Sequence, residues 1–150
     1  MTDPLPQTLH VVAGALYDDL GRLLIAQRPP GKALAGRWEF PGGKIHDGED
    51  AYGALVRELQ EELGVAVDAA ERLMFYAACY PGRTIWLDVW LVRRWHGVPT
   101  GLDAQAFEWV ERGCLRDHDI LEADAPIIAA TSESFSLSTD RTVATICVSE

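Results

Sequence analysis

The chain has 150 residues, of which 48% are hydrophobic and 24% are charged, and its formal net charge at pH 7 is −10. These values are typical of a soluble globular protein with one domain, and no stretch reaches the apolar length of a membrane span. The acidic balance argues against a binding surface for nucleic-acid polymers, because such surfaces need clustered Lys and Arg. Free nucleotides complexed with metal ions remain compatible with it.

Three cysteines, Cys79, Cys114 and Cys147, are widely spaced and form no CxxC or metal-ligand pattern. We interpret them as packing residues in a reducing compartment. The first residues, MTDPLPQT, lack a basic stretch followed by an apolar one, which is the pattern of a secretory signal. A cytoplasmic location is therefore expected.

The N-terminal part of the chain predicts strands and a loop. Residues 9–16 are apolar enough for a buried strand, residues 18–21 are typical of a hairpin turn, and Arg22–Gln27 is expected to return as the partner strand. Two prolines and a glycine then begin a loop over residues 28–37, which we expect to lie beside the site and gate it. Residues 38–40 form a short extended piece before Pro41.

Residues 50–63 predict a helix, because they contain no proline and mostly good helix formers, and Gly64 is expected to end it. At about 100° per residue, Glu58, Glu61 and Glu62 converge on one face of this helix. Four apolar residues fall on the other face, which we expect to enter the core: Tyr52, Val56, Leu59 and Leu63.

The three glutamates carry like charges within one turn, so a positive partner is expected. Because Arg57 lies off their face, the expected partner is a divalent cation that prefers oxygen ligands, Mg²⁺ or Mn²⁺. A solvated helix face is the alternative interpretation. It explains neither the turn at Gly42 and Gly43, where backbone without Cβ atoms can approach a ligand, nor Glu49, which is placed to meet Arg57 and orient the site.

Beyond this helix, residues 71–80 and 84–95 are long β-type runs joined by a Pro-Gly turn, which predicts a hairpin. Apolar side chains of the second run point to both faces, as expected for a strand that is covered on both sides. Residues 106–110 predict a short strand and residues 121–131 a helix, while residues 132–150 are either an added strand or disordered. The order of elements predicts an α/β fold with a mixed sheet and helices on its faces.

Residues 43–65 fit the pattern G-x5-E-x7-R-E-U-x-E-E-x-G-U, where U is a bulky aliphatic residue, and this resembles the Nudix box. All nine specified positions match: Gly43, Glu49, Arg57, Glu58, Leu59, Glu61, Glu62, Gly64 and Val65. From about residue 10 to 129 the chain is also similar to the MutT-type nucleoside triphosphate pyrophosphohydrolases. The resemblance implies an α/β/α sandwich, which we expect over residues 1–131, with residues 132–150 as a tail.

The resemblance also implies that Glu58, Glu61 and Glu62 bind the metal ions together with the carbonyl of Gly42. A further acid from a later loop completes the ligand set, and in this chain it would be Asp103. Hydrolysis of a polyphosphate needs cations on the phosphoryl oxygens and a positioned water. One helix glutamate that is not fully committed to metal is expected to deprotonate that water.

Positive and aromatic residues are expected along the substrate. Arg28 matches the family arginine after the second strand and Lys44 follows the double glycine, so both are candidates for phosphate binding, although a solvated surface lysine is the alternative for Lys44. Phe40 aligns with an aromatic residue that lines the family's base pocket. Tyr80 and Arg83 flank the tip of the long hairpin, where a base can stack. These last three residues also fit ordinary core or turn packing.

Asp124 bears on the choice of base. In relatives that cleanse oxidised guanine nucleotides, this position resembles an Asn, whose amide both donates and accepts. An ionised Asp only accepts, which suits the exocyclic amine of cytosine, and cytidine-preferring relatives carry Asp here. Burial can keep the carboxyl protonated and restore a donor. A role as N-cap of the last helix is the structural alternative.

The expected function is Mg²⁺-dependent hydrolysis of a nucleoside triphosphate to a nucleoside monophosphate and pyrophosphate, with 8-oxo-dGTP as the leading substrate. Asp124 favours CTP or 5-methyl-dCTP as the alternative. A Nudix-like module that binds nucleotides without hydrolysis is a further alternative, although such modules usually lose carboxylates that this chain keeps. The expected partner is a small nucleotide, without nucleic-acid polymer or membrane, and the protein is expected to be a monomer or weak dimer.

Overall fold

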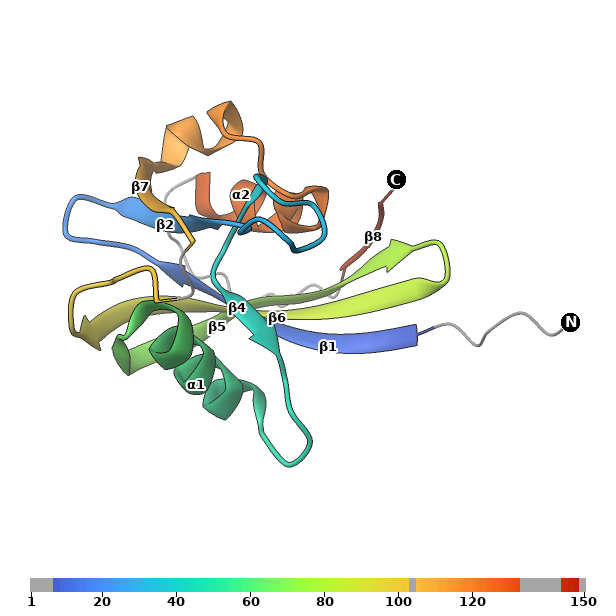
Figure 1. The fold of residues 1–150 in the computed structure, drawn as a ribbon, viewed down its shortest axis with the longest axis horizontal. Coiled ribbons are helices and arrows are strands. Elements are labelled where there is room, and N and C mark those ends of the chain that lie inside the picture. Colours follow the sequence, from blue (N-terminus) through green and yellow to red (C-terminus); the bar gives the residue numbers. More distant parts are fainter. Residues whose placement is uncertain (1–6, 103–104, 133–143, 149–150) are drawn as a thin grey trace, which may run out of the picture.

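The computed structural model describes residues 7–102, 105–132 and 144–148 and has an α/β fold (Figure 1). A five-stranded mixed sheet has the order β4-β1-β6-β5-β8, and a three-stranded sheet has the order β3-β2-β7. The elements are β1 (Gln7–Leu16), β2 (Arg22–Gln27), β3 (Trp38–Glu39), β4 (Gly42–Lys44), α1 (Ala51–Leu63), β5 (Ala66–Tyr80), β6 (Arg83–His96), β7 (Phe107–Glu111), the 3₁₀ helices η1 (Arg112–Asp117) and η2 (Glu122–Asp124), α2 (Ala125–Ser132) and β8 (Ala144–Cys147).

The larger sheet is covered on both faces, as Figure 1 shows. Helix α1 packs on one face, where Leu55 and Leu59 are fully buried together with Val92 of β6. The smaller sheet and α2 lie on the other face, where Ile127 packs in a core that also contains Val89. The predicted α/β class, mixed sheet and two-sided burial of the second hairpin strand are therefore confirmed.

The first two strands do not form the hairpin that the sequence predicted. Strand β1 joins the larger sheet between β4 and β6, whereas β2 joins the smaller sheet between β3 and β7. Only an isolated bridge between Tyr17 and Leu23 connects them. The turn itself is present, because the side chain of Asp18 accepts hydrogen bonds from the backbone of Leu20 and Arg22. The turn signal was local, whereas sheet membership is decided by packing further along the strands.

The long hairpin of β5 and β6 is confirmed, and it begins earlier than predicted, at Ala66. Two register shifts between Val67 and Ala70 and one between Arg72 and Met74 interrupt its ladder. These bulges explain why the start of β5 lacks a clean two-residue alternation in the sequence. The short strand and the last helix are confirmed as β7 and α2, whereas η1 between them was not predicted.

Helix α1 ends where its sequence predicts and begins one residue later, because Asp50 is its N-cap. The side chain of Asp50 accepts a hydrogen bond from the backbone N–H of Gly53 at 2.6 Å, and Gly64 ends the helix with φ at 68°. Leu59 and Leu63 are buried as expected. The core face is rotated from the predicted one, because Ala54 and Leu55 are fully buried, whereas Tyr52 is 37% exposed.

Part of the tail is an added strand, since β8 pairs in parallel with β5 at the edge of the larger sheet. Residues 133–143 and 149–150 of the predicted tail lie outside the described residues. Among the residues that are described, no helix is both long enough and apolar enough to cross a membrane.

Candidate active site

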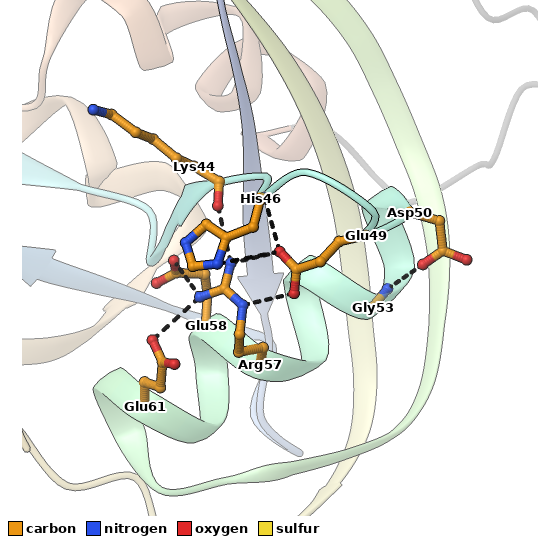
Figure 2. A network of polar contacts seen from close by, with 8 residues as sticks. All are labelled: Lys44, His46, Glu49, Asp50, Gly53, Arg57, Glu58 and Glu61. Carbon is orange, nitrogen blue, oxygen red and sulfur yellow. Dashed lines mark hydrogen bonds and ion pairs between the residues drawn. The ribbon is translucent and has the colours of Figure 1, made fainter.

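Arg57 lies at the centre of a polar network between α1 and the turn before it (Figure 2). Its Nε and Nη2 atoms donate to the two carboxylate oxygens of Glu49 at 2.7 and 2.8 Å. Its Nη1 atom donates to Glu58 at 2.9 Å and to Glu61 at 3.2 Å. A further bond from Nη2 reaches the carbonyl of Lys44 at 3.0 Å. We call Glu49, Arg57, Glu58 and Glu61 the arginine network.

The network contains the contact between Glu49 and Arg57 that their spacing predicted. Hydrogen bonds from Arg57, and one from the backbone N–H of His46, lower the pKa of Glu49 to about 2. The same bond to Glu49 raises the pKa of Arg57. Glu49 is therefore ionised at neutral pH and fixes the guanidinium, and Arg57 in turn holds the carboxylate of Glu58.

Gly42 and Gly43 lie in the short strand β4, not in the open turn that the sequence predicted. A Cβ atom at Gly42 would lie 1.9 Å from the carbonyl oxygen of Val12, and one at Gly43 would lie 2.5 Å from the carboxyl group of Glu58. The space without Cβ atoms is thus taken by the neighbouring strand and by Glu58. Gly43 is the reason that this carboxylate can lie against the backbone.

A cavity of about 490 Å³ opens beside this strand, within the range of about 300–1,000 Å³ that is usual for small-molecule sites. Nine of the predicted site residues line it: Arg28, Phe40, Gly42, Lys44, Glu58, Glu62, Tyr80, Arg83 and Asp124. Glu49, Arg57 and Glu61 do not line it, and the Glu61 side chain is 58% exposed on the outer side of the arginine network.

A donor set in the cavity lining fits a divalent cation. Glu58, Glu62 and the backbone of Gly42 offer hard oxygen atoms, and the missing Cβ of Gly43 leaves a cradle for the Glu58 carboxylate. Within the described part of the chain, no three Asp, Glu, His or Cys side chains form a ready-made cluster. The carboxylates of Glu58 and Glu61 are instead turned toward Arg57.

Asp103, the predicted fifth ligand, lies outside the described residues. The residues on both sides of it contact the end of α1, because the backbone N–H of Leu102 donates to the carbonyl of Glu62 at 3.0 Å. The side-chain amide of Gln105 donates to the same carbonyl at 3.4 Å. The loop therefore returns to the helix that carries the glutamates.

The two predicted phosphate ligands have different surroundings. Arg28 donates to both carboxylate oxygens of Glu39 at 3.1 and 3.0 Å and to the carbonyl of Ala33 at 2.7 Å. Lys44 directs its carbonyl at Arg57, whereas its amino group extends away from the arginine network (Figure 2). Ala33 lies in the predicted loop over residues 28–37, and this loop lines the cavity with Lys32, Ala33 and Leu34.

Glu39 was not predicted as a site residue. Burial raises its pKa, while its ion pair with Arg28 opposes that effect. The only sequence signal for a role of Glu39 was its position as an acidic residue between two aromatic residues. The segment is too short to show an alternation of polar and apolar residues. The structure shows that it fixes the guanidinium of Arg28 at the cavity wall.

Phe40, Tyr80, Arg83 and Asp124 form what we call the base end of the cavity. Phe40 and Asp124 are 3% and 5% exposed, and the backbone N–H of Phe40 donates to Oδ2 of Asp124 at 3.0 Å. The guanidinium of Arg83 lies 4.9 Å from the ring centre of Tyr80. The side chain of Asp124 therefore accepts its hydrogen bond from Phe40, the residue after β3. It does not act as the N-cap of the last helix, which was the structural alternative.

Burial raises the pKa of Asp124 to about 7, because the cavity wall removes its carboxyl from water. The negative charge of Glu39 adds to this shift, whereas the N–H of Phe40 and the charge of Arg28 oppose it. The segment before Asp124 is fixed by Tyr76, a fully buried residue whose hydroxyl donates to the carbonyl of Ala123 at 2.6 Å. Asp124 therefore has a fixed position and titrates near neutral pH.

Comparisons with known proteins agree with this arrangement. A sequence model of the NUDIX domain matches residues 8–131. The 8-oxo-dGTP diphosphatase of Escherichia coli is 36% identical over 121 residues, which are 81% of this chain and 94% of that protein. The CTP pyrophosphohydrolase of the same organism is 37% identical over 122 residues, which are 81% of this chain and 90% of that protein.

The fold has close counterparts among solved structures. A MutT structure, from work on the proteins of Aliivibrio salmonicida and Vibrio cholerae, superposes with a TM-score of 0.75 at 32% identity. The match covers 86% of this chain and 100% of the other. Since the domain match, the relatives and the arginine network all agree, the chain belongs to the Nudix hydrolase family.

Proposed function

We propose that this Nudix hydrolase converts a nucleoside triphosphate to a nucleoside monophosphate and pyrophosphate with the help of Mg²⁺, for which Mn²⁺ can substitute. One observation carries the proposal. A single cavity is lined by the carboxylates Glu58 and Glu62, by the cations Arg28 and Lys44, and by the buried pair of Phe40 and Asp124. Oxygen ligands for a cation, positive groups for phosphates and a buried polar group for a base are the groups that a metal-complexed nucleoside triphosphate needs.

In this proposal Glu58 and Glu62, with Glu61, Asp103 and the carbonyl of Gly42, hold the metal ions. A bound divalent cation neutralises charge on the phosphoryl oxygens, which otherwise repel an incoming nucleophile. The protein contributes position, because Glu49 fixes Arg57 and Arg57 orients Glu58.

One of the helix glutamates accepts a proton from water, whose oxygen forms a bond to phosphorus as the bridging P–O bond breaks. Pyrophosphate and the nucleoside monophosphate are the two products of this step. In this proposal Arg28 and Lys44 bind the phosphoryl oxygens, which is supported by their position in the cavity lining. Glu39 already holds the guanidinium of Arg28 by two hydrogen bonds.

The leading substrate is 8-oxo-dGTP, on which relatives with 36% identity are named to act. Asp124 can serve this base when it is protonated, because Oδ2 accepts from Phe40 and the other oxygen can then carry a proton for donation. The second candidate is CTP or 5-methyl-dCTP. It is favoured by the ionised form of the same carboxyl, which accepts from an exocyclic amine, and by the similarity to a CTP pyrophosphohydrolase.

The proposed partner is the free nucleotide, in the cytoplasm and without a nucleic-acid polymer, because the net charge of −10 disfavours a polyanion. The proposed state of the protein is a monomer or weak dimer.

The test is a panel of canonical and modified nucleoside triphosphates, compared by kcat/KM with Mg²⁺ and analysed for both products. We expect 8-oxo-dGTP to have the highest value and pyrophosphate to be released. A cytidine nucleotide at the top would replace the leading substrate by the second candidate. Release of orthophosphate, or no turnover of any nucleotide, would contradict the proposed reaction.

A further inference from the structure

Two cysteines that lie far apart in the sequence are neighbours in the larger sheet. Strand β8 pairs in parallel with β5, and the register places Cys147 opposite Cys79. The backbone N–H of Val148 donates to the carbonyl of Cys79 at 2.9 Å, which fixes the ladder at this point. Figure 1 shows β8 beside β5 at the edge of the sheet.

The two thiols point to the same side of the sheet. Register partners on adjacent strands share a face, and alternate residues face opposite sides. Ala78 and Ile146, the preceding pair, pack in the core with α2, so Cys79 and Cys147 face the other side. Adjacent strands lie about 4.8 Å apart, which falls inside the Cα separation of roughly 4.4–6.8 Å that disulfides span.

The pair is also accessible, which corrects our interpretation of the cysteines as packing residues. Cys147 and Cys114 are exposed and Cys79 is half-buried, and all three are free thiols. Cys114 lies on η1, outside the strands, so it takes no part in this pairing. The chain therefore offers one close pair and one separate thiol of similar exposure.

We propose that Cys79 and Cys147 form an intramolecular disulfide when the protein meets a peroxide. The Cys147 thiolate attacks a peroxide oxygen, the O–O bond breaks, and hydroxide leaves while the sulfur becomes a sulfenic acid. The Cys79 thiolate then attacks that sulfur, the S–S bond forms and a second hydroxide leaves. Both hydroxides take up the protons of the thiols, so two thiols are oxidised and hydrogen peroxide becomes two waters.

The disulfide attaches the last described strand to the wall of the cavity. Ile146 packs against the core on the side of α2, and Val148 is 9% exposed within it. Tyr80, the residue after Cys79, lines the base end of the cavity. Oxidation thus closes a long loop between residues 79 and 147 and fixes β8 on its neighbour. This inference does not depend on the proposed function.

The experiment treats the full chain with hydrogen peroxide, alkylates the remaining thiols, and determines intact mass and disulfide-linked peptides. We expect a monomeric product with one linkage between Cys79 and Cys147 and one alkylated thiol at Cys114. The melting temperature should rise by about 5–10 °C on oxidation and return after reduction.

Two single variants at exposed positions provide the controls. Cys114→Ser should form the same linkage and show the same rise in melting temperature, whereas Cys147→Ser should form no intramolecular linkage and show no rise. Cross-linking only between chains, a linkage that includes Cys114, or three thiols that all remain open to alkylation would overturn the proposal.

Discussion

The arginine network and the base end of the cavity are built in different ways. The network takes its side chains from α1 and the turn before it, so its members are at most eight positions apart in their direct contacts. The base end joins Phe40 to Asp124 across 84 positions and adds Tyr80 and Arg83 from the long hairpin. The first is partly exposed and charged, whereas the second contains the buried Phe40 and Asp124, and burial raises the pKa of the Asp124 carboxyl.

This difference separates two tasks. The arginine network depends only on α1 and the turn before it, so its charges come together as soon as this helix forms. In the proposed function, the choice of base depends on segments that meet only when the whole chain has folded. Damage to the network should therefore lower the turnover of every nucleotide, while a change at the base end should alter the ranking of nucleotides.

The largest effect is expected from Glu58→Gln, which keeps the size of the side chain and removes its charge. Loss of a metal-binding or proton-accepting carboxylate should lower kcat/KM by about 10³-fold for all nucleotides. Steady-state kinetics and thermal melts measure the loss and the fold. Glu111→Gln, on the exposed side of β7, is the matched control and should keep full activity. Unchanged turnover in Glu58→Gln would remove this residue from the reaction.

The buried carboxyl of Asp124 should make the stability of the fold depend on pH. Its pKa is raised from 3.8 to about 7, so the folded state binds more protons than the unfolded state between these two pH values. The free energy of unfolding therefore falls as the pH rises. Relative to Asp124→Asn, the wild type should lose roughly 2–3 kcal/mol of unfolding free energy between pH 5 and pH 8. Denaturant titrations of both proteins at the two pH values measure it. An equal change in unfolding free energy in both proteins between the two pH values would show that Asp124 does not titrate in this range.

A smaller effect is expected from Arg57→Lys, which keeps the charge and loses the two-pronged bond to Glu49. Supporting residues of this kind typically contribute about 10- to 100-fold to activity. Glu49→Gln should cause a similar loss, and the double variant should lose less than the product of both losses because the residues act together. Full additivity in kcat/KM would show that the two residues act separately.

The smallest effect concerns selectivity. Asp124→Asn supplies a permanent donor, keeps an acceptor for the N–H of Phe40, and should shift the ratio of kcat/KM toward 8-oxo-dGTP over CTP by about 10-fold at pH 8. The shift should shrink at pH 6, where the wild-type carboxyl is protonated. Asp119→Asn, at a side chain that is 74% exposed, is the control. An unchanged ratio would place Asp124 outside base recognition.

The sequence predicted the helix and its internal contacts because these signals are local. Helical spacing places Glu58 and Glu62 on the cavity wall, whereas Glu61 is exposed and turns to Arg57, and Gly64 ends the helix as predicted. The contact between Glu49 and Arg57 followed from their separation by two turns. The rotation of the core face was missed because the predicted face began at Tyr52, whereas the structure buries Ala54 and Leu55 and leaves Tyr52 37% exposed.

Features that depend on tertiary pairing were not predictable in the same way. The separation of β1 from β2 is decided by sheet partners, β6 and β7, that come much later in the chain. The pairing of Cys79 with Cys147 depends on an edge strand near the end of the chain. The ion pair of Glu39 with Arg28 needs the loop between them to fold back.

Tyr76 fixes the backbone beside Asp124, so the side chain at this position can be exchanged without loss of the local structure. Its hydroxyl holds the carbonyl of Ala123, and the N–H of Asp124 donates to the carbonyl of Leu121 at 2.9 Å. The backbone on which the side chain of Asp124 stands is thus anchored without help from that side chain. In the proposed function, a single mutational step that exchanges this acid for its amide can therefore change which nucleotide is preferred without moving the backbone that carries the side chain.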